Sequence, residues 1–316
     1  MSLRRALAFA AIVASLPSGA EAQQPASAGV PRLLSTDTLA AWQERGAPMR
    51  LLDVRLDVWT YLKGHLPQAQ YLNIETLRAS KGGVPVQLLD APWYRELFKR
   101  LGLDPAVPVV VYSAGETLNI DATFAVWVLA SMGHPRVYLL DGGSSKWSYE
   151  NREIARRYPD VEPAGRWWNS RTFRPPAATL ADVQRGMESG VLLVDARPHD
   201  QYVGEAGSQM RLGHLPGAIN HYWQDDLETV GFGRVFRSVD SLRARYVAEG
   251  IVPDRDIIVY CNSATEASHV YFVLKYLLAY PRVRIYAGSW TEWAEREELP
   301  IERGSGPRTG PILRAQ

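Results

Sequence analysis

The single cysteine of the 316-residue chain, Cys261, lies in the stretch Ile257-Ile258-Val259-Tyr260-Cys261-Asn262-Ser263-Ala264-Thr265-Glu266-Ala267. An apolar, mostly β-branched run precedes it, and a stretch typical of a helix follows it. One cysteine cannot form an internal disulfide, so Cys261 is a buried packing residue, an intermolecular link or a reactive thiol. A reactive thiol would act as a nucleophile, because a thiolate attacks readily and forms covalent intermediates.

The position of Cys261 favours the reactive interpretation. If the apolar run is a buried parallel strand, Cys261 lies at its carboxyl end, where ligand sites of open α/β sheets occur. The next helix directs unpaired N–H groups and its positive dipole end toward the loop, which can then hold an anion. We therefore expect the pKa of Cys261 to be lowered and its sulfur to be exposed and mostly ionised.

Elements of two kinds must position this loop. Val191–Val194 and Ile257–Tyr260 are continuous apolar runs, typical of strands buried on both faces. The stretch from Ser241 to near Gly250 is predicted to form a helix. An apolar stripe at helical spacing predicts a helix that covers the sheet: Val270, Val273, Leu274, Leu277 and Leu278. Strands that alternate with helices predict an α/β fold with mainly parallel sheets.

The sequence contains the same pattern twice. The matching blocks are Leu51–Arg55 with Leu193–Arg197, Gly64–Ala69 with Gly213–Ala218, Val109–Ser113 with Ile257–Cys261, and Tyr138–Trp147 with Arg284–Trp293. The period is far longer than the roughly 20–50 residues of solenoid repeats, so each copy is a domain. We predict domains at 30–150 and 179–305, a surface-packed linker at 151–178 and a tail at 306–316.

Composition and the N-terminus limit the functional classes. A hydrophobic content of 46% and a charged content of 22% are ordinary for a globular protein. The net charge of +1, without a long basic block, predicts no nucleic-acid partner and no membrane-surface binding. Arg4 and Arg5, an apolar stretch and Ala20-Glu21-Ala22 are typical of a signal peptide at 1–22. We expect export to a bacterial periplasm, without a membrane anchor after cleavage.

The chain resembles the two-domain rhodaneses, the thiosulfate/3-mercaptopyruvate sulfurtransferase family. The resemblance rests on Asp-x-Arg, Gly-His-Leu-Pro-x-Ala, the strand–Tyr–Cys loop and Gly-Ser-Trp-x-x-Trp, in that order. It implies a tandem of rhodanese-like α/β domains in which the second is catalytic, because Ser113 stands where Cys261 stands. It also implies sulfane-sulfur transfer through a Cys261 persulfide, from a small sulfur-containing anion to a thiol or cyanide. No metal or organic cofactor is implied.

The resemblance also implies roles for residues near Cys261. Arg197 and Arg211 match positions where relatives place cations, and an arginine fork suits a carboxylate or sulfonate. The loop residues expected at the substrate are Asn262, Ser263, Ala264, Thr265 and Glu266. Asp195 is expected to order an arginine rather than to react.

The histidines and tryptophans are expected to be structural. His214 has a counterpart, His65, in the copy that lacks a thiol, so neither is expected to be a base for Cys261. His269, one turn into the predicted helix, is expected to face solvent. Trp290 and Trp293 are expected to be packing anchors.

Two loop residues depart from the family pattern, Cys-x-x-Gly-x-Thr or Arg. Ala264 replaces the glycine, which costs about 1–2 kcal/mol if the loop needs a positive φ there. Glu266 replaces a hydroxyl or cation, and its carboxylate would repel thiosulfate and raise the pKa of the thiol. We therefore expect thiosulfate to be a poor donor and Glu266→Arg to raise its turnover.

Other functions of a single thiol fit less well. A phosphatase of this fold needs an arginine six residues after the cysteine, where the chain has Ala267. A disulfide exchanger or thiol peroxidase would normally need a resolving cysteine. The remaining alternative is a non-catalytic rhodanese-like module for binding or for carrying sulfur, which the altered loop allows.

Overall fold

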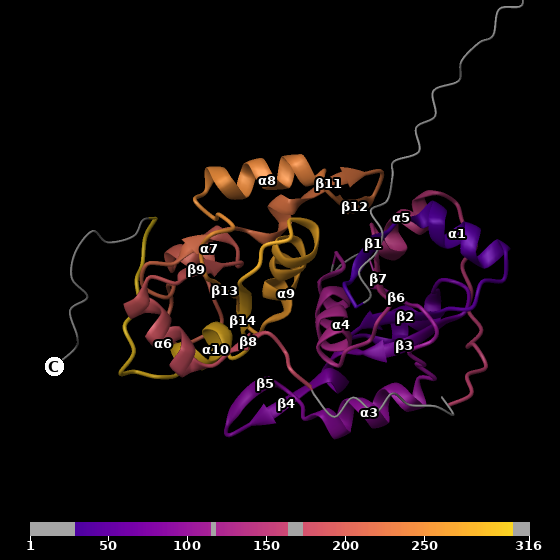
Figure 1. Cartoon of the computed structure of the whole chain (residues 1–316), viewed down its shortest axis with the longest axis horizontal. Coiled ribbons are helices and arrows are strands. Elements are labelled where there is room, and N and C mark those ends of the chain that lie inside the picture. The colour runs from indigo at the N-terminus through magenta and orange to yellow at the C-terminus, as the bar shows by residue number, and fades with distance from the viewer. Residues whose placement is uncertain (1–28, 115–117, 164–172, 306–316) are drawn as a thin grey trace, which may run out of the picture.

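Two parallel sheets, one in each half of the chain, form the framework of the molecule (Figure 1). The computed structural model describes residues 29–114, 118–163 and 173–305. The expected signal peptide at 1–22 and the tail at 306–316 lie outside the described residues, as does part of the linker.

The first sheet has the strand order β1-β7-β6-β2-β3. Its strands are β1 (Arg32–Leu34), β2 (Arg50–Arg55), β3 (Ala69–Asn73), β6 (Val109–Tyr112) and β7 (Val137–Leu140). The helices around it are α1 (Thr36–Glu44), α2 (Val58–Lys63), η1 (Ile74–Leu77), α3 (Ala91–Arg100), α4 (Ile120–Ser131) and α5 (Gly143–Tyr149). A hairpin of β4 (Arg78–Lys81) and β5 (Val84–Leu88) projects from this domain.

The second sheet has the order β10-β9-β13-β14-β8. Its strands are β8 (Ala177–Ala178), β9 (Leu192–Asp195), β10 (Ile219–Asn220), β13 (Ile257–Tyr260) and β14 (Val283–Tyr286). Its helices are α6 (Leu180–Ser189), α7 (His199–Val203), η3 (Trp223–Asp226), α8 (Val239–Ala248), α9 (Thr265–Phe272), the π-helical η4 (Val273–Leu277) and α10 (Ser289–Ala294). The corresponding hairpin is β11 (Leu227–Val230) and β12 (Gly233–Phe236).

The two sheets match strand for strand. Read from the opposite edge, the second order becomes β8-β14-β13-β9-β10, the counterpart of β1-β7-β6-β2-β3, and every pairing within both sheets is parallel. The predicted tandem α/β fold is confirmed. The second sheet begins earlier than expected, because Ala177–Ala178 pairs with Ile285–Tyr286 inside the range predicted as linker.

The central strands are buried along their whole length, as their apolar runs predict. All four residues of β6 and of β13 are buried, because helices cover both faces of each sheet. The predicted helix after Cys261 is present as α9 and continues as η4. It is buried almost all round, because its outer face packs on α4 of the first domain.

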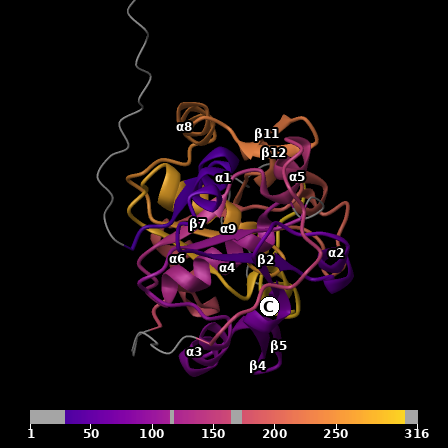
Figure 2. The same cartoon turned by 90° about the vertical axis from the view of Figure 1, so that its right-hand side faces the viewer.

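The domains meet through equivalent elements. Helices α4 and α9 pack together between the sheets, and Thr123 Oγ1 lies 2.8 Å from Ser268 Oγ (Figure 1). Hairpin β11/β12 reaches α5 of the first domain, and strand β5 reaches α10 of the second (Figures 1 and 2). The Phe236 N–H donates to Asp141 Oδ1 across this boundary at 3.0 Å. Each domain therefore braces the other.

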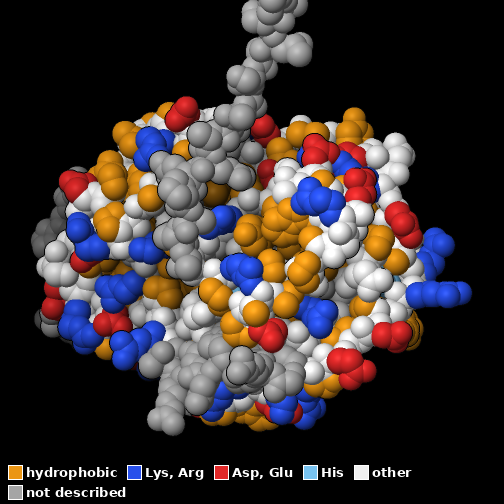
Figure 3. Space-filling model, turned by 45° about the vertical axis from the view of Figure 1, so that its right-hand side comes forward, with side chains coloured by type: hydrophobic (Ala, Val, Ile, Leu, Met, Phe, Trp, Pro, Cys, Tyr) orange, Lys and Arg blue, Asp and Glu red, His pale blue; other side chains and the backbone are white. Residues whose placement is uncertain are grey.

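The surface carries both signs of charge. Lys and Arg side chains are mixed with Asp and Glu over the face shown in Figure 3, in keeping with the net charge of +1. Among the described residues, the helices are too short or too polar to cross a membrane. In the same part of the chain, no group of three or more His, Cys, Asp or Glu side chains is placed to hold a metal ion.

Candidate active site

Cys261 directly follows β13, at the carboxyl end of the second sheet, as predicted. Its N–H donates to Ser289 Oγ at 3.2 Å, and its carbonyl accepts from the Trp290 N–H at 2.9 Å. The Ala264 N–H also donates to Ser289 Oγ at 3.2 Å. Ser289 thus fixes both ends of the loop. It belongs to the Gly-Ser-Trp block, yet we did not predict this role from the sequence.

The loop turns sharply into α9 at Ala264. This residue caps the helix with φ of 67°, in the left-handed region that favours glycine. The Asn262 side chain donates to Gln201 Oε1 at 2.9 Å, and Ser263 Oγ lies 3.5 Å from Thr265 Oγ1. The structure therefore brings all the predicted loop residues together around Cys261.

The thiol is buried rather than exposed. Cys261 has 0% of its surface accessible, although the N–H groups of Ser263 and Ala267 donate to its sulfur. Burial, and then the Glu266 carboxyl that faces the sulfur, raise the pKa of Cys261 well above its ordinary value. The expected exposed, mostly ionised sulfur is therefore wrong for this structure, because desolvation and a neighbouring carboxyl outweigh the backbone donors.

Glu266 contacts the thiol from the first turn of α9. Its carboxyl accepts from its own N–H and from the Asn262 N–H, and it shares a hydrogen bond with Cys261. The residue as a whole is only partly buried. Burial raises the pKa of Glu266 as well. The thiol and the carboxyl therefore form a pair that favours retaining a proton.

Arg197 is held inside the protein by Asp195. Its Nε donates to Asp195 Oδ1 at 2.9 Å, and its Nη2 donates to Asp195 Oδ2 at 2.6 Å and to the Gly213 carbonyl at 2.7 Å. The guanidinium lies 4.7 Å from the Trp290 ring centre, and only 1% of Arg197 is exposed. Asp195 makes the contacts expected of a residue that orders the arginine. Arg197 acts on Cys261 through its charge.

Within the described part of the chain, Arg211 makes its hydrogen bonds away from the loop at Cys261. Its Nη1 and Nη2 donate to the carbonyls of Arg296 and Leu299, both at 2.6 Å, and so anchor the segment after α10. A different arginine reaches the loop from the first domain: Arg78 Nη1 donates to Thr265 Oγ1 at 2.8 Å. We did not predict Arg78, because no local motif marks a contact between domains.

The histidine pair has the same surroundings in both domains. His214 Nδ1 lies 2.7 Å from the Tyr202 carbonyl, and its ring stacks on Tyr202 with ring centres 3.7 Å apart. His65 lies on Tyr61 in the same way, with its Nδ1 3.1 Å from the Tyr61 carbonyl. The contacts are thus the same with and without a thiol in the domain, and a structural role for His214 stays a prediction.

His269 was expected to face solvent, and that prediction is wrong. It is fully buried, with Nε2 3.4 Å from Asp226 Oδ2, because η3 and hairpin β11/β12 cover this side of α9. Trp290 and Trp293 are buried in the second domain's core, as expected.

The first domain repeats the loop geometry with a hydroxyl. Ser113 is buried, and its Oγ accepts from the Ala122 N–H at 2.8 Å, as the Cys261 sulfur accepts from the Ala267 N–H. Asn119 caps α4 with φ of 70°, as Ala264 caps α9. Gly115–Thr117 of this loop lie outside the described residues.

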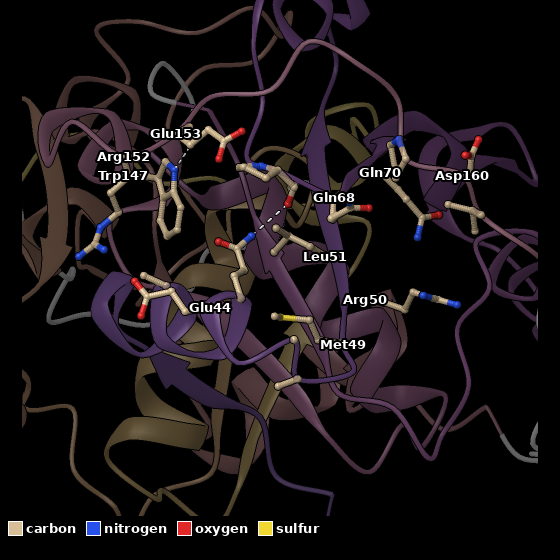
Figure 4. A pocket seen from close by; sticks show the side chains of 17 residues that line it. Glu44, Met49, Arg50, Leu51, Gln68, Gln70, Trp147, Arg152, Glu153 and Asp160 are labelled. Carbon is tan, nitrogen blue, oxygen red and sulfur yellow. Dashed lines mark hydrogen bonds between the residues drawn. The ribbon is translucent and has the colours of Figure 1, made fainter.

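A cavity of about 670 Å³ lies elsewhere in the first domain (Figure 4). It opens between α1, the starts of β2 and β3, and the segment 152–161. Its wall combines apolar side chains with both signs of charge, including Glu44, Arg50 and Asp160. None of the predicted site residues lines it. The cavity is therefore separate from the residues around Cys261.

Comparison with known families decides the classification. The sequence model of the rhodanese-like domain matches residues 35–150 and 179–296, the two halves that carry Ser113 and Cys261. The chain belongs to the rhodanese-like family. The predicted resemblance to two-domain rhodaneses is confirmed, and the second matched range includes Cys261.

Two curated relatives span nearly the whole rhodanese tandem. The sulfur carrier protein TtuD of Thermus thermophilus is 35% identical, over 86% of this chain and 96% of its own length. A thiosulfate sulfurtransferase of Corynebacterium glutamicum is 33% identical, over 88% of this chain and 92% of its own. A solved variant of EanB in complex with hercynine has a TM-score of 0.77 and 19% identity, covering 87% of this chain and 70% of that one, and shares the fold.

Proposed function

We propose that this rhodanese-type sulfurtransferase transfers sulfane sulfur through a persulfide on Cys261. The observation that carries the proposal is the loop itself, in which the N–H groups of Ser263 and Ala267 converge on the sulfur of the single cysteine of the chain. Such donors suit a charged persulfide as well as a thiolate. The name of the Corynebacterium relative supports the same class of reaction.

The donor is proposed to be a small sulfur-containing anion, and the acceptor a thiol or cyanide. Glu266 makes thiosulfate the poorer donor of the two considered, because a carboxylate beside the sulfur repels a dianion. 3-Mercaptopyruvate carries less charge on its reacting sulfur and is the better fit. Export, predicted from residues 1–22, stays part of the proposal.

The test is the intact mass of the protein after treatment with thiosulfate or 3-mercaptopyruvate, with Cys261→Ser as the control. Wild-type protein should gain the mass of one sulfur atom, lose it on addition of cyanide or a thiol, and show ping-pong kinetics. Cys261→Ser should gain nothing. Absence of a sulfur adduct with both donors would contradict the enzyme proposal.

A sulfur carrier is the second candidate. The buried thiol with its raised pKa favours it, because such a sulfur reacts slowly with small donors. The relative named sulfur carrier protein TtuD supports it too. A carrier would accept sulfur from a persulfide-bearing protein while turning over neither small donor, and the same mass measurement separates the two candidates.

A further inference from the structure

Glu266 stands beside the reacting sulfur in place of the family's hydroxyl or cation. We propose that Glu266 is the proton carrier of the reaction: it takes the proton of the Cys261 thiol and returns it to the leaving group of the donor. This inference rests on the proposed sulfur transfer and assigns a catalytic role to a side chain that otherwise only hinders anionic donors.

The position of the carboxyl suits this role. It hydrogen-bonds with the thiol while two backbone N–H groups, its own and that of Asn262, hold it in place. Cys261 has no exposed surface, and Glu266 is the titratable side chain that faces its sulfur from the first turn of α9. A proton carrier must lie within hydrogen-bond reach of the proton it moves, and Glu266 does.

Other charged and titratable groups around the pair set its affinity for a proton. Asp195, at the end of β9, acts with burial to raise the pKa of Glu266. Arg197, held by Asp195, places a positive charge near the sulfur. Tyr222, beside η3, also faces Glu266, which contributes to the raised pKa of that tyrosine. Arg78 reaches the loop one residue before Glu266, at Thr265.

The reaction balances without any additional reactant when the donor is a thiol bound to carbon. The Glu266 carboxylate accepts the proton of Cys261, and the thiolate attacks the donor sulfur. An S–S bond forms as the C–S bond breaks, and the C–S electron pair leaves on carbon. That carbon takes the proton from Glu266 and is reduced to C–H, while the donor sulfur becomes sulfane sulfur. With 3-mercaptopyruvate the products are the Cys261 persulfide and pyruvate.

Thiosulfate demands less of Glu266. The thiol still has to lose its proton, but the leaving group, sulfite, departs as a stable anion and needs no proton, and the carboxylate also repels this dianion. A carbanion or enolate leaving group instead needs a general acid, whose contribution is typically about 10²–10⁴-fold. Loss of the Glu266 carboxyl should therefore slow the reaction with 3-mercaptopyruvate much more than the reaction with thiosulfate, and this difference separates a proton carrier from a simple negative charge.

The experiment compares Glu266→Gln with wild-type protein in single-turnover reactions with each donor. Persulfide is read by intact mass, and pyruvate is measured with 3-mercaptopyruvate. We expect the rate with 3-mercaptopyruvate to fall at least about 100-fold and the rate with thiosulfate to fall much less. The retained thiosulfate reaction shows that the variant is folded. Glu295→Gln, an exposed carboxyl on the same domain, should change neither rate.

A second readout follows the thiol itself. The pH dependence of Cys261 alkylation should move to lower pH in Glu266→Gln, because a neighbouring carboxylate has been removed. Faster reaction of Glu266→Gln with both donors would overturn the proposal and leave charge repulsion alone. Equal rates of variant and wild type would overturn it as well, as would loss of both reactions at an unchanged unfolding temperature. Absence of persulfide in wild type instead contradicts the proposed function.

Discussion

Ala264, in the loop after Cys261, has an unfavourable backbone conformation. Its φ of 67° lies in a region where a Cβ atom costs about 1–2 kcal/mol. The first domain uses Asn119 at the same cap position, and asparagine tolerates this region better than alanine. The strain is retained next to the reacting sulfur, where the turn into α9 aims the Ala267 N–H at Cys261.

Replacement of Ala264 by glycine should therefore not destabilise the protein, whereas the same change in a helix should. Ala244 is an exposed residue inside α8, so Ala244→Gly is expected to lower the free energy of unfolding by about 1 kcal/mol. We expect Ala264→Gly to be more stable than Ala244→Gly by about 1–2 kcal/mol, measured by urea denaturation. Equal losses in the two variants would show that Ala264 is not strained.

At this scale the sequence predicts which residues meet but not how they are solvated. The order of motifs places Cys261 at a strand end and makes Asp195 the partner of Arg197, because both relations are local in sequence. Burial of the thiol depends on segments distant in sequence, such as Ser289, and this burial is the largest cause of the raised pKa. The lowered pKa expected from the helix N-terminus was therefore wrong, whereas the opposing effect of Glu266 was foreseen from the sequence. A helix N-terminus does not determine a pKa by itself.

A buried charge network joins three elements of the second domain. His221, after β10, lies with Nε2 3.1 Å from Asp226 of η3 and Nδ1 2.5 Å from Glu249 after α8. Tyr246 of α8 donates to Asp226 Oδ2 at 2.9 Å. Burial disfavours the charged form of His221, but the two carboxylates outweigh it and raise its pKa to about 9. Burial of Asp226 is likewise outweighed, by His221, and its pKa falls to about 2.

This network predicts a loss of stability on the alkaline side. A histidine whose pKa rises on folding stabilises the protein fully below its unfolded pKa of about 6.5, and the contribution disappears as the pH rises through about 9. Wild-type protein should lose on the order of 2–3 kcal/mol between these limits relative to His221→Gln, measured by urea denaturation at each pH. A constant difference between the two proteins would show that His221 is not charged in the folded state.

The acid side of the same network has the opposite sign. Asp226, whose pKa falls on folding, contributes above about pH 4 and loses its contribution as the pH falls toward about 2. Burial of His134 outweighs the hydrogen bonds that it makes with Asp104 and Arg136 and lowers its pKa to about 4, so its effect lies below pH 6.5 and does not overlap the window of His221. The alkaline window is thus the one that isolates His221 from these groups.

The four-residue apolar strands could be predicted from the sequence, and the two-residue strand β8 could not. The runs that become β6, β9 and β13 are buried on both faces and stand out in the sequence. Strand β8 has only two residues, and its pairing with β14 depends on the register of a distant strand. The range predicted as linker therefore included β8. The His221 network could not be predicted from the sequence either, because its residues come close together only after β10, η3 and α8 have packed.

At the scale of the whole molecule, the first domain has no cysteine but contacts the loop that follows Cys261. Its helix α4 packs on α9, and its Arg78 lies 2.8 Å from the hydroxyl of Thr265 in that loop. Arg78 is itself held by an ion pair with Glu75 and by the Phe124 ring, 5.6 Å away. Internal repetition predicts two domains, but not this docking, because the contact joins residues 187 positions apart.

If Arg78 positions the loop through Thr265, the two residues should act as one unit in catalysis. Arg78→Met keeps apolar bulk over Phe124 and removes the donor, and Thr265→Val removes the acceptor. Loss of a hydrogen bond worth about 1.4 kcal/mol corresponds to about a tenfold lower kcat/KM for sulfur transfer in each single variant. The double variant should be no worse than either single, because the same bond is lost only once. If the loss in kcat/KM of the double variant equals the product of the two single losses, Arg78 and Thr265 affect the reaction independently. The first domain would then stabilise the fold without positioning the loop.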